Sequence, residues 1–448
     1  MAEIPKVRTE LSEKLSLFIP DYVSDTVVSS VMEDQLPVGF STTNQTNPIR
    51  FYVRGTDHWI DFEKSYFEIE GTIEGTDGDA TTPLDADNTT HFSLTNNFLH
   101  NLFSSIHVNV QNSPVTFSND NYPYIAYIQN LLNYNNDFME MYSDLFLWSK
   151  DTAGHMSLFG KSQTNNKGAQ HRKRWIAPGN KVYGILKLQS PVFLMQQYLL
   201  NFVDVDIVLN RNDNPAFYFM MNVAGNFKFR LDSIIFRVRK VKLNDEYNSA
   251  VARMFQQGEN IPYPLGNNVV FTKTYSGYGT DIIEDNLFQG KLPRRVVLGI
   301  VNNRAYTGTS TMNPFNFEHK DLIEVGLFVN GMAHPIPMTP MDFTARKTHR
   351  MYHYVLESMQ STNPHKTSDA LAISKEEFDK GFTLFSFDMS SDQYGGLNQN
   401  TLSSNPANVR LHLRFKSGQT TEQITLIVYY EAASHMFVAP GLVVVPVK

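Results

Sequence analysis

Two pairs of carboxylates are the residues whose spacing could most readily support chemistry. Asp204 and Asp206 lie two positions apart, so a strand would place both on one face, as a general acid and base require. Asp57 and Asp61, in the segment GTDHWID, could form a similar pair. Carboxylates on the solvated face of a strand or in a turn are the commoner arrangement. We therefore interpret both pairs as structural.

His349 and His353 have the spacing of two metal ligands on one helix face, but no third ligand is suggested nearby. We interpret them as surface or interface histidines, and Gly277 and Gly279 as turn residues. The motifs of P-loops, zinc proteases, serine hydrolases and dinucleotide sites are absent from the sequence. The sequence therefore predicts no catalytic residue, no cofactor and no metal site.

Two basic clusters could contact a polyanion. The first covers residues 171–174 (HRKR), and the second comprises Arg237, Arg239, Lys240 and Lys242. We interpret the first as a solvated loop, with a contact inside a larger protein assembly or with a polyanion as the alternative. The second could meet nucleic acid, an acidic partner or a neighbouring subunit.

The composition of the 448 residues is that of a globular protein, with 42% hydrophobic and 19% charged residues. The net charge of −7 argues against coating of duplex DNA by this chain alone. Because there is no cysteine, disulfide scaffolds and thiol catalysis are excluded. With no apolar run of membrane-spanning length and no secretory signal pattern, we expect a soluble protein made inside the cell.

In the first half of the chain, apolar residues alternate as they do in strands. They do so over residues 51–53, 67–73, 106–110 and 203–209, and a phase slip at residues 232–233 suggests a bulge. One amphipathic helix is predicted after Asn121-Tyr-Pro123. Residues 75–90 and 161–174 read as loops.

Residues 244–257 read as a helix that Gly258 ends, and the second half then repeats the same order. Strands are predicted over 296–301, 325–329, 382–387, 409–415, 424–430 and 443–447. A helix over roughly 343–360 follows Asp342 as its N-cap.

The order of strand, Asn/Pro turn, helix, long loop and paired strands therefore occurs twice. Val110 and Val329 occupy matching places 219 positions apart. Two copies of one β-rich unit are the simplest interpretation. We divide the chain into an N-terminal arm (1–48), a first unit (49–243), a linker helix (244–260) and a second unit (261–448).

A set of distinctive segments runs through both halves of the chain. They are residues 98–103 (FLHNLF), 119–127 (NDNYPYIAY), 198–207 (YLLNFVDVDI), 261–264 (IPYP), 286–290 (NLFQG), 292–301 (LPRRVVLGIV), 328–331 (FVNG) and 381–388 (GFTLFSFD). Together they resemble the major capsid proteins of Polinton/Maverick and adintovirus-like elements, and they follow in that family's order over about residues 50–448. The first turn differs, with Gln111-Asn-Ser113 where the family commonly has Asn-Gly.

The resemblance implies an all-β double jelly roll, two eight-stranded antiparallel sandwiches in tandem with short helices in the loops. It implies a homotrimer that forms a pseudo-hexameric capsomer of an icosahedral shell around double-stranded DNA, located in the virion. A minor single jelly-roll vertex protein is the expected partner, with no sequence-specific nucleic-acid binding and no membrane span. Tyr124, Tyr127, Tyr352 and Tyr354 are candidate interface aromatics, although core packing suits them equally.

Two alternatives remain. A two-domain β-sandwich carbohydrate-binding protein or glycoside-acting enzyme would have a pocket with convergent carboxylates. A receptor-binding spike would usually carry fibrous or low-complexity repeats, and none is present in the sequence. Replacing Asp204 and Asp206 with alanine separates enzyme from capsid protein, because only an enzyme would lose turnover.

Overall fold

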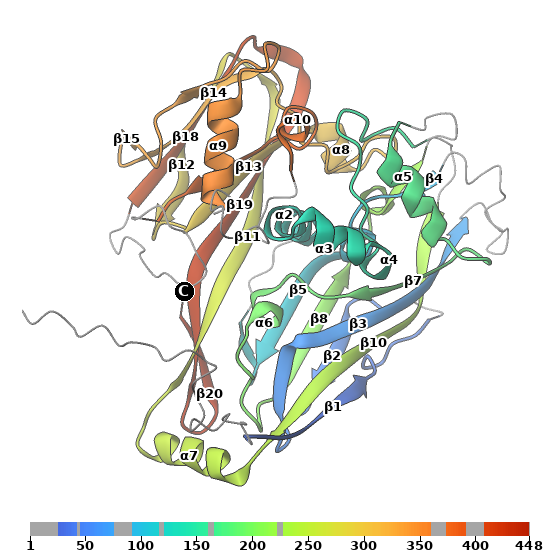
Figure 1. The fold of residues 1–448 in the computed structure, drawn as a ribbon, viewed down its shortest axis with the longest axis vertical. Coiled ribbons are helices and arrows are strands. Elements are labelled where there is room, and N and C mark those ends of the chain that lie inside the picture. The colour runs from blue at the N-terminus through green and yellow to red at the C-terminus, as the bar shows by residue number, and fades with distance from the viewer. Residues whose placement is uncertain are drawn as a thin grey trace, which may run out of the picture.

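The computed structural model places two β-sandwiches side by side, joined at one end by a linker helix (Figure 1). It describes residues 26–42, 45–75, 92–115, 121–159, 165–221, 227–359, 373–390 and 407–447. The predicted loop at 75–90 and residues 1–25 of the predicted arm lie almost entirely outside these ranges.

The first sandwich consists of two four-stranded antiparallel sheets, with strand orders β1-β10-β3-β7 and β2-β8-β5-β6. Apolar residues alternate along each strand because one face of each sheet is turned toward the core. The strands are β1 (Val27–Gln35), β2 (Ile49–Val53), β3 (Trp59–Gly75), β5 (Phe103–Val110), β6 (Ser113–Pro114), β7 (Lys181–Leu186), β8 (Val205–Arg211) and β10 (Phe227–Leu243); β4 (Phe92–Leu94) and β9 (Phe219–Met221) form a separate pair.

The second sandwich repeats this arrangement, with the orders β11-β19-β13-β17 and β12-β18-β14-β15. Two short strands are added to it: β16 (Thr339–Pro340) pairs with β14, and β20 (Val443–Val447) pairs with β19. The eight main strands are β11 (Ile261–Tyr278), β12 (Asp281–Gly290), β13 (Arg295–Asn302), β14 (Leu322–Val329), β15 (Met332–Ala333), β17 (Leu384–Asp388), β18 (Ala407–Phe415) and β19 (Gln419–Ala439).

The predicted internal repeat is confirmed strand by strand. Strands β5 and β14 each have eight residues and end at Val110 and Val329, the pair that the sequence matched. Each is followed by a two-residue turn with positive φ, Gln111-Asn112 in one case and Asn330-Gly331 in the other. The fold is the predicted double jelly roll, and we call the sandwiches the first roll and the second roll.

Short helices occupy the loops. Helix α7 is the predicted linker helix, and Gly258 follows its last turn with φ +84°. The α-helices are α1 (Phe98–Asn101), α2 (Tyr122–Asn133), α3 (Asn136–Met141), α4 (Ser143–Phe146), α5 (Lys167–Arg172), α6 (Pro191–Leu194), α7 (Asp245–Gln256), α8 (Asn303–Thr307), α9 (His349–Ser358) and α10 (Lys375–Phe378), and 3-10 turns cover Lys173–Trp175 (η3) and Pro215–Phe217 (η4).

Three sequence predictions need correction. The helix expected over 343–360 begins at His349, and its N-cap is Thr348 rather than Asp342, whose side chain accepts from the Ala345 amide outside the helix. The expected loop at 161–174 contains helix α5. Part of the expected N-terminal arm forms strand β1, which pairs with β10. The predicted bulge is confirmed by a register shift between Leu231 and Ser233.

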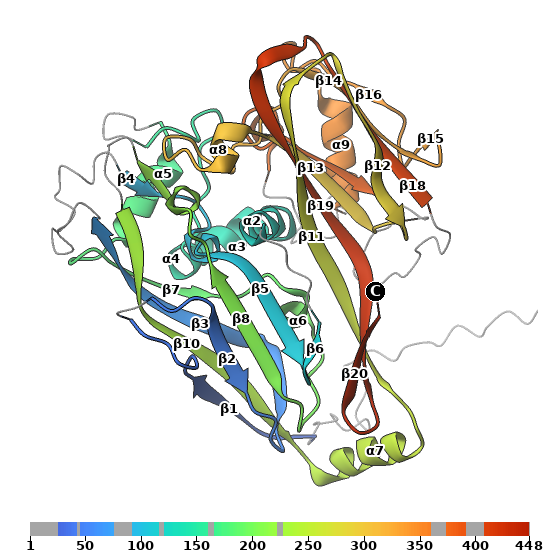
Figure 2. The ribbon, with the colours of Figure 1, turned by 180° about the vertical axis from the view of Figure 1, so that it is seen from behind.

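The two cores meet where the rolls touch. The core of the first roll includes five residues of the second roll, and the core of the second includes most of the apolar side chains of α2. Figure 2 shows the shared region: long strands β11 and β19 run down beside the first roll, with β20 at their lower end. The five residues are Tyr263, Leu265, Met436, Val438 and Val444.

Candidate assembly surface

Helix α2 forms the centre of the contact between the rolls. The sequence predicts it as amphipathic, but residues 122–132 are buried on all sides. Tyr122 and Ala126 face the first roll's core, whereas Tyr124 and Tyr127 belong to the core of the second roll. Tyr124 and Tyr127, two of the four candidate interface tyrosines, therefore hold together the two halves of one chain and are not available to a neighbouring copy.

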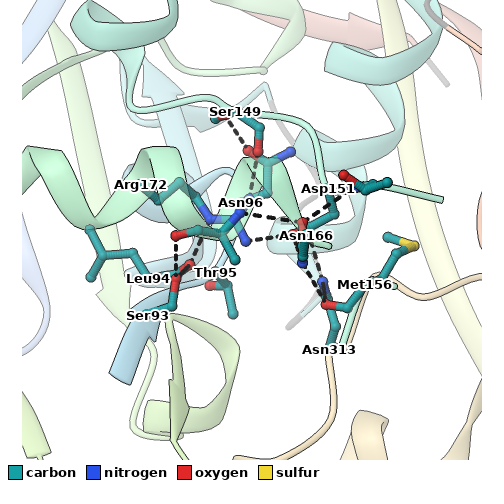
Figure 3. A network of polar contacts seen from close by, with 12 residues as sticks. Ser93, Leu94, Thr95, Asn96, Ser149, Asp151, Met156, Asn166, Arg172 and Asn313 are labelled. Carbon is teal, nitrogen blue, oxygen red and sulfur yellow. Dashed lines mark hydrogen bonds and ion pairs between the residues drawn. The ribbon is translucent and has the colours of Figure 1, made fainter. Parts of the chain in front are cut away.

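A buried polar network fastens the same contact (Figure 3). The guanidinium of Arg172 donates to the Leu94 carbonyl at 2.7 Å and to Asp151 Oδ1 at 2.6 Å. It also donates to the Ser149 carbonyl at 2.5 Å. The other carboxylate oxygen of Asp151 accepts from Asn313 of the second roll at 3.0 Å. The ion pair thereby links the two rolls.

The burial of Arg172 shows that our interpretation of the first basic cluster as a solvated loop was wrong for this residue. Its side chain is 0% exposed, and so is that of Asp151, so neither charge is available to a polyanion. Helix α5 presents Arg172 inward, while Arg174 two residues later is exposed. A burial that depends on a carboxylate 21 residues away gives no local sequence signal.

The second basic cluster is largely neutralised by the two strands beside it. Arg237 pairs with Asp34 of β1 and with Glu68 of β3, the latter at 2.9 Å. Lys240 lies 2.8 Å from Glu33. Because strand β10 lies between two strands that carry carboxylates, most of this cluster is held in ion pairs, while Lys242 is exposed.

A second buried ion cluster lies on β13 and β19. Glu431 pairs with Arg295 and, at 3.0 Å, with Arg294. Burial opposes ionisation of Glu431, but the two guanidinium groups outweigh it and lower its pKa to about 2. Arg295 also donates to Asn133 at the end of α2, at 3.3 Å. This cluster too connects the second roll to α2.

The carboxylate pairs do not converge on a common site. Asp206 pairs with Arg50 at 2.6 Å. Asp204 accepts from the Tyr52 hydroxyl and from the Gly55 amide, both at 2.8 Å. The contacts tie β2 and the residues after it to the start of β8, as the structural interpretation predicts.

Asp57 and Asp61 are equally occupied by local contacts. Asp61 is buried and accepts from the Lys64 amide at 3.2 Å. Asp57 lies 2.8 Å from the Nδ1 atom of His58. The two carboxylates therefore have different partners.

The candidate metal pair has no third ligand among the described residues. His353 lies 3.5 Å from Glu357 on the same helix.

A hollow of about 110 Å³ lies between β14 and the segment before α9, and the residues that line it include Asp321, Asp342 and Lys416. It brings none of the predicted pairs together. In the described ranges, no helix is long and apolar enough to cross a membrane.

Two exposed apolar surfaces were not predicted from the sequence. Edge strand β1 exposes large side chains on both faces: Val27, Val28, Val31 and Met32. The β14–β15 hairpin exposes Met332, 77% of whose surface is accessible. The segment VVSSVMED (27–34), apolar within a polar region, was the available signal for β1. By contrast, Tyr352 and Tyr354 are half-buried against their own roll.

Comparison with known proteins finds solved structures that share the fold and a curated protein with similar sequence. No protein-family model matches the chain. The uncharacterized protein F54H12.2 of Caenorhabditis elegans is 22% identical over 296 residues, which are 66% of this chain and 68% of that protein.

Among solved structures, a chain of the Sputnik virophage matches with a TM-score of 0.68 and 10% identity, over 100% of this chain and 92% of its own. The mavirus major capsid protein matches with a TM-score of 0.54 and 10% identity, over 100% and 95%. The Faustovirus major capsid protein matches with a TM-score of 0.57 and 7% identity, over 96% and 93%. At these identities the likeness concerns the fold, and the chain has the double jelly-roll fold of viral major capsid proteins along its whole length.

Proposed function

We propose that the chain is the major capsid protein of a Polinton- or adintovirus-like element and has no catalytic role. The observation that carries the proposal is the pair of matched rolls: the same two sheet orders occur twice, side by side. Three such chains would present six similar rolls around one axis, and this number suits a hexagonal lattice position. The motif order of the sequence supports the same lineage.

In this proposal the chain forms homotrimeric capsomers that tile an icosahedral shell around a double-stranded DNA genome in the virion. The linker helix at 244–260 would separate the two rolls, and the first roll would also include strand β1, which the sequence analysis had assigned to the arm. A single jelly-roll vertex protein would be the minor partner, on the strength of the family resemblance. The pairing of both carboxylate sets with structural partners supports a non-enzymatic role.

Electron microscopy of the purified chain tests this function. We expect pseudo-hexagonal particles that, as concentration rises, join into flat hexagonal arrays or closed shells. Images of dispersed two-lobed particles at every concentration and salt condition would contradict the proposal.

A further inference from the structure

We infer that β1 of one copy binds the β14–β15 hairpin of a second copy. This contact between two chains would resemble the contact that joins the two rolls within one chain. The inference rests on the proposed function and adds which surfaces meet. It starts from the two hairpins that the internal repeat makes equivalent.

The first hairpin contacts the second roll, with Ser113 half-buried. Ser113, the first residue of β6, donates its hydroxyl to the Val444 carbonyl of β20 at 3.0 Å. Val115 follows in the first roll's core, the cluster that also contains Val444. The β5–β6 hairpin of the first roll thus sits against the lower end of the sheet formed by β11, β19 and β20.

The second hairpin has no such cover in the described chain. Met332 is the first residue of β15, and it lies 219 positions after Ser113, the same offset that separates Val110 from Val329. It is 77% exposed, and Ala333 beside it is exposed as well. Ser113 therefore contacts the other roll, whereas Met332, at the matching position of the second roll, is exposed.

The surface that would receive this hairpin follows from the strand order, because β20 has no counterpart among the described strands of the first roll. Strands β11 and β1 are the first strands of their rolls, and each pairs with the last of the eight main strands, β19 or β10. The start of β11 is buried against the first roll: Tyr263 donates to the Tyr198 carbonyl at 3.2 Å and accepts from the Leu200 amide at 3.0 Å. Strand β1 holds the same place in the strand order of its own sheet.

Where β11 is covered, β1 is exposed among the described residues. Tyr263 and Leu265 are 2% and 5% exposed, whereas Val28 and Val31 are 61% and 53% exposed. In the described ranges β1 pairs with β10 alone, so its outer edge also offers unpaired backbone groups. Apolar side chains on both faces of an edge strand are a recognised site for association.

Both open surfaces are apolar, and they belong to opposite rolls. A hairpin of the second roll on β1 of the next copy is a head-to-tail contact, which closes into a ring when the rotation per copy is suitable. The occupant of β1 is therefore a second copy of this chain, with Met332 as an apolar anchor near the centre of the contact.

A matched pair of variants tests this contact. Met332→Asp places a carboxylate in the proposed apolar contact and should weaken self-association at least about tenfold in sedimentation equilibrium. Met141→Asp is the control, because Met141 on α3 has nearly the same exposure, 79%, and lies outside the proposed contact. Circular-dichroism melting curves of both variants should match the unmodified chain, since both positions are exposed.

Cross-linking tests which surfaces meet. Because the chain has no cysteine, single substitutions can be joined specifically. We expect a short bis-maleimide to link Val28→Cys chains to Met332→Cys chains, and not to link Val28→Cys chains to Met141→Cys chains. Neither variant should link to itself in a head-to-tail ring.

The outcomes separate the two levels of the proposal. An assembled unmodified chain, with both aspartate variants assembling equally and no Val28–Met332 link, would overturn this inference and leave the proposed function intact. An unmodified chain that stays monomeric would overturn the proposed function and this contact with it. Loss of assembly in Met332→Asp alone, together with the specific link, supports both.

Discussion

Tyr127 of α2 lies flat against Phe315 of the second roll, with ring centroids 4.3 Å apart and ring planes 5° from parallel. The two residues are 188 positions apart, and both are fully buried. This stack is part of the joint between two rolls that could otherwise be independent domains. In the proposed capsomer, in which each chain would contribute two adjacent positions, this buried joint would hold the two rolls together.

Removing this ring should loosen the joint. Tyr127→Ala should lower the free energy of unfolding by about 3–5 kcal/mol, because it leaves a cavity beside Phe315. Tyr183→Ala on β7 is the control: that tyrosine is 49% exposed, and its loss should change stability by about 0.5 kcal/mol or less. Chemical denaturation of both variants measures the two changes in the free energy of unfolding. Equal changes would show that the stack contributes no more to stability than an exposed tyrosine does.

Arg172 should be as important to stability as its burial implies. Arg172→Met strands the Asp151 carboxylate without its cation, and we expect a loss of about 3–5 kcal/mol. Arg174→Met, in the same basic cluster but exposed, should be nearly neutral. If thermal melting shows the two variants to be alike, the network does not fasten the rolls.

Lowering the pH should reduce the free energy of unfolding, because Glu431 becomes protonated and loses its ion pairs. Its pKa is about 2 in the folded chain and 4.5 as a reference, so the unfolded state binds its proton first as pH falls. The stabilising contribution is fully present above pH 4.5 and declines as pH falls toward 2. Glu431→Gln lacks this component and is already less stable at neutral pH, because Arg294 and Arg295 lose their carboxylate. Urea unfolding measured from pH 6 to pH 3 compares the two chains; parallel curves would contradict this assignment.

Asp206 tests the structural interpretation of the carboxylate pair. Asp206→Asn should lower stability by about 1 kcal/mol or less, because Arg50, its ion-pair partner, is 56% exposed. Assembly should be unchanged, as judged by size-exclusion chromatography. A complete loss of assembly with intact folding would show instead that this face takes part in contacts between copies.

Much of the fold followed from the sequence because strand alternation and turn residues are local. The bulge near Ser233 and the linker helix rest on patterns within a few residues, and the match of Val110 with Val329 compares two such local patterns. The burial of α2 could not be predicted in this way, since the second roll that covers its outer face begins more than a hundred positions later. Arg172 was misassigned for the same reason: its neighbours in sequence are polar, while its partners come from other loops.

Native mass spectrometry of the untagged chain, at increasing concentration, distinguishes a trimeric capsomer from a monomer. We expect a dominant species of three copies of the 51.1 kDa chain, about 153 kDa, with larger assemblies appearing as lattice contacts form. A chain that remains at 51.1 kDa across concentrations and salt conditions would contradict the proposed function.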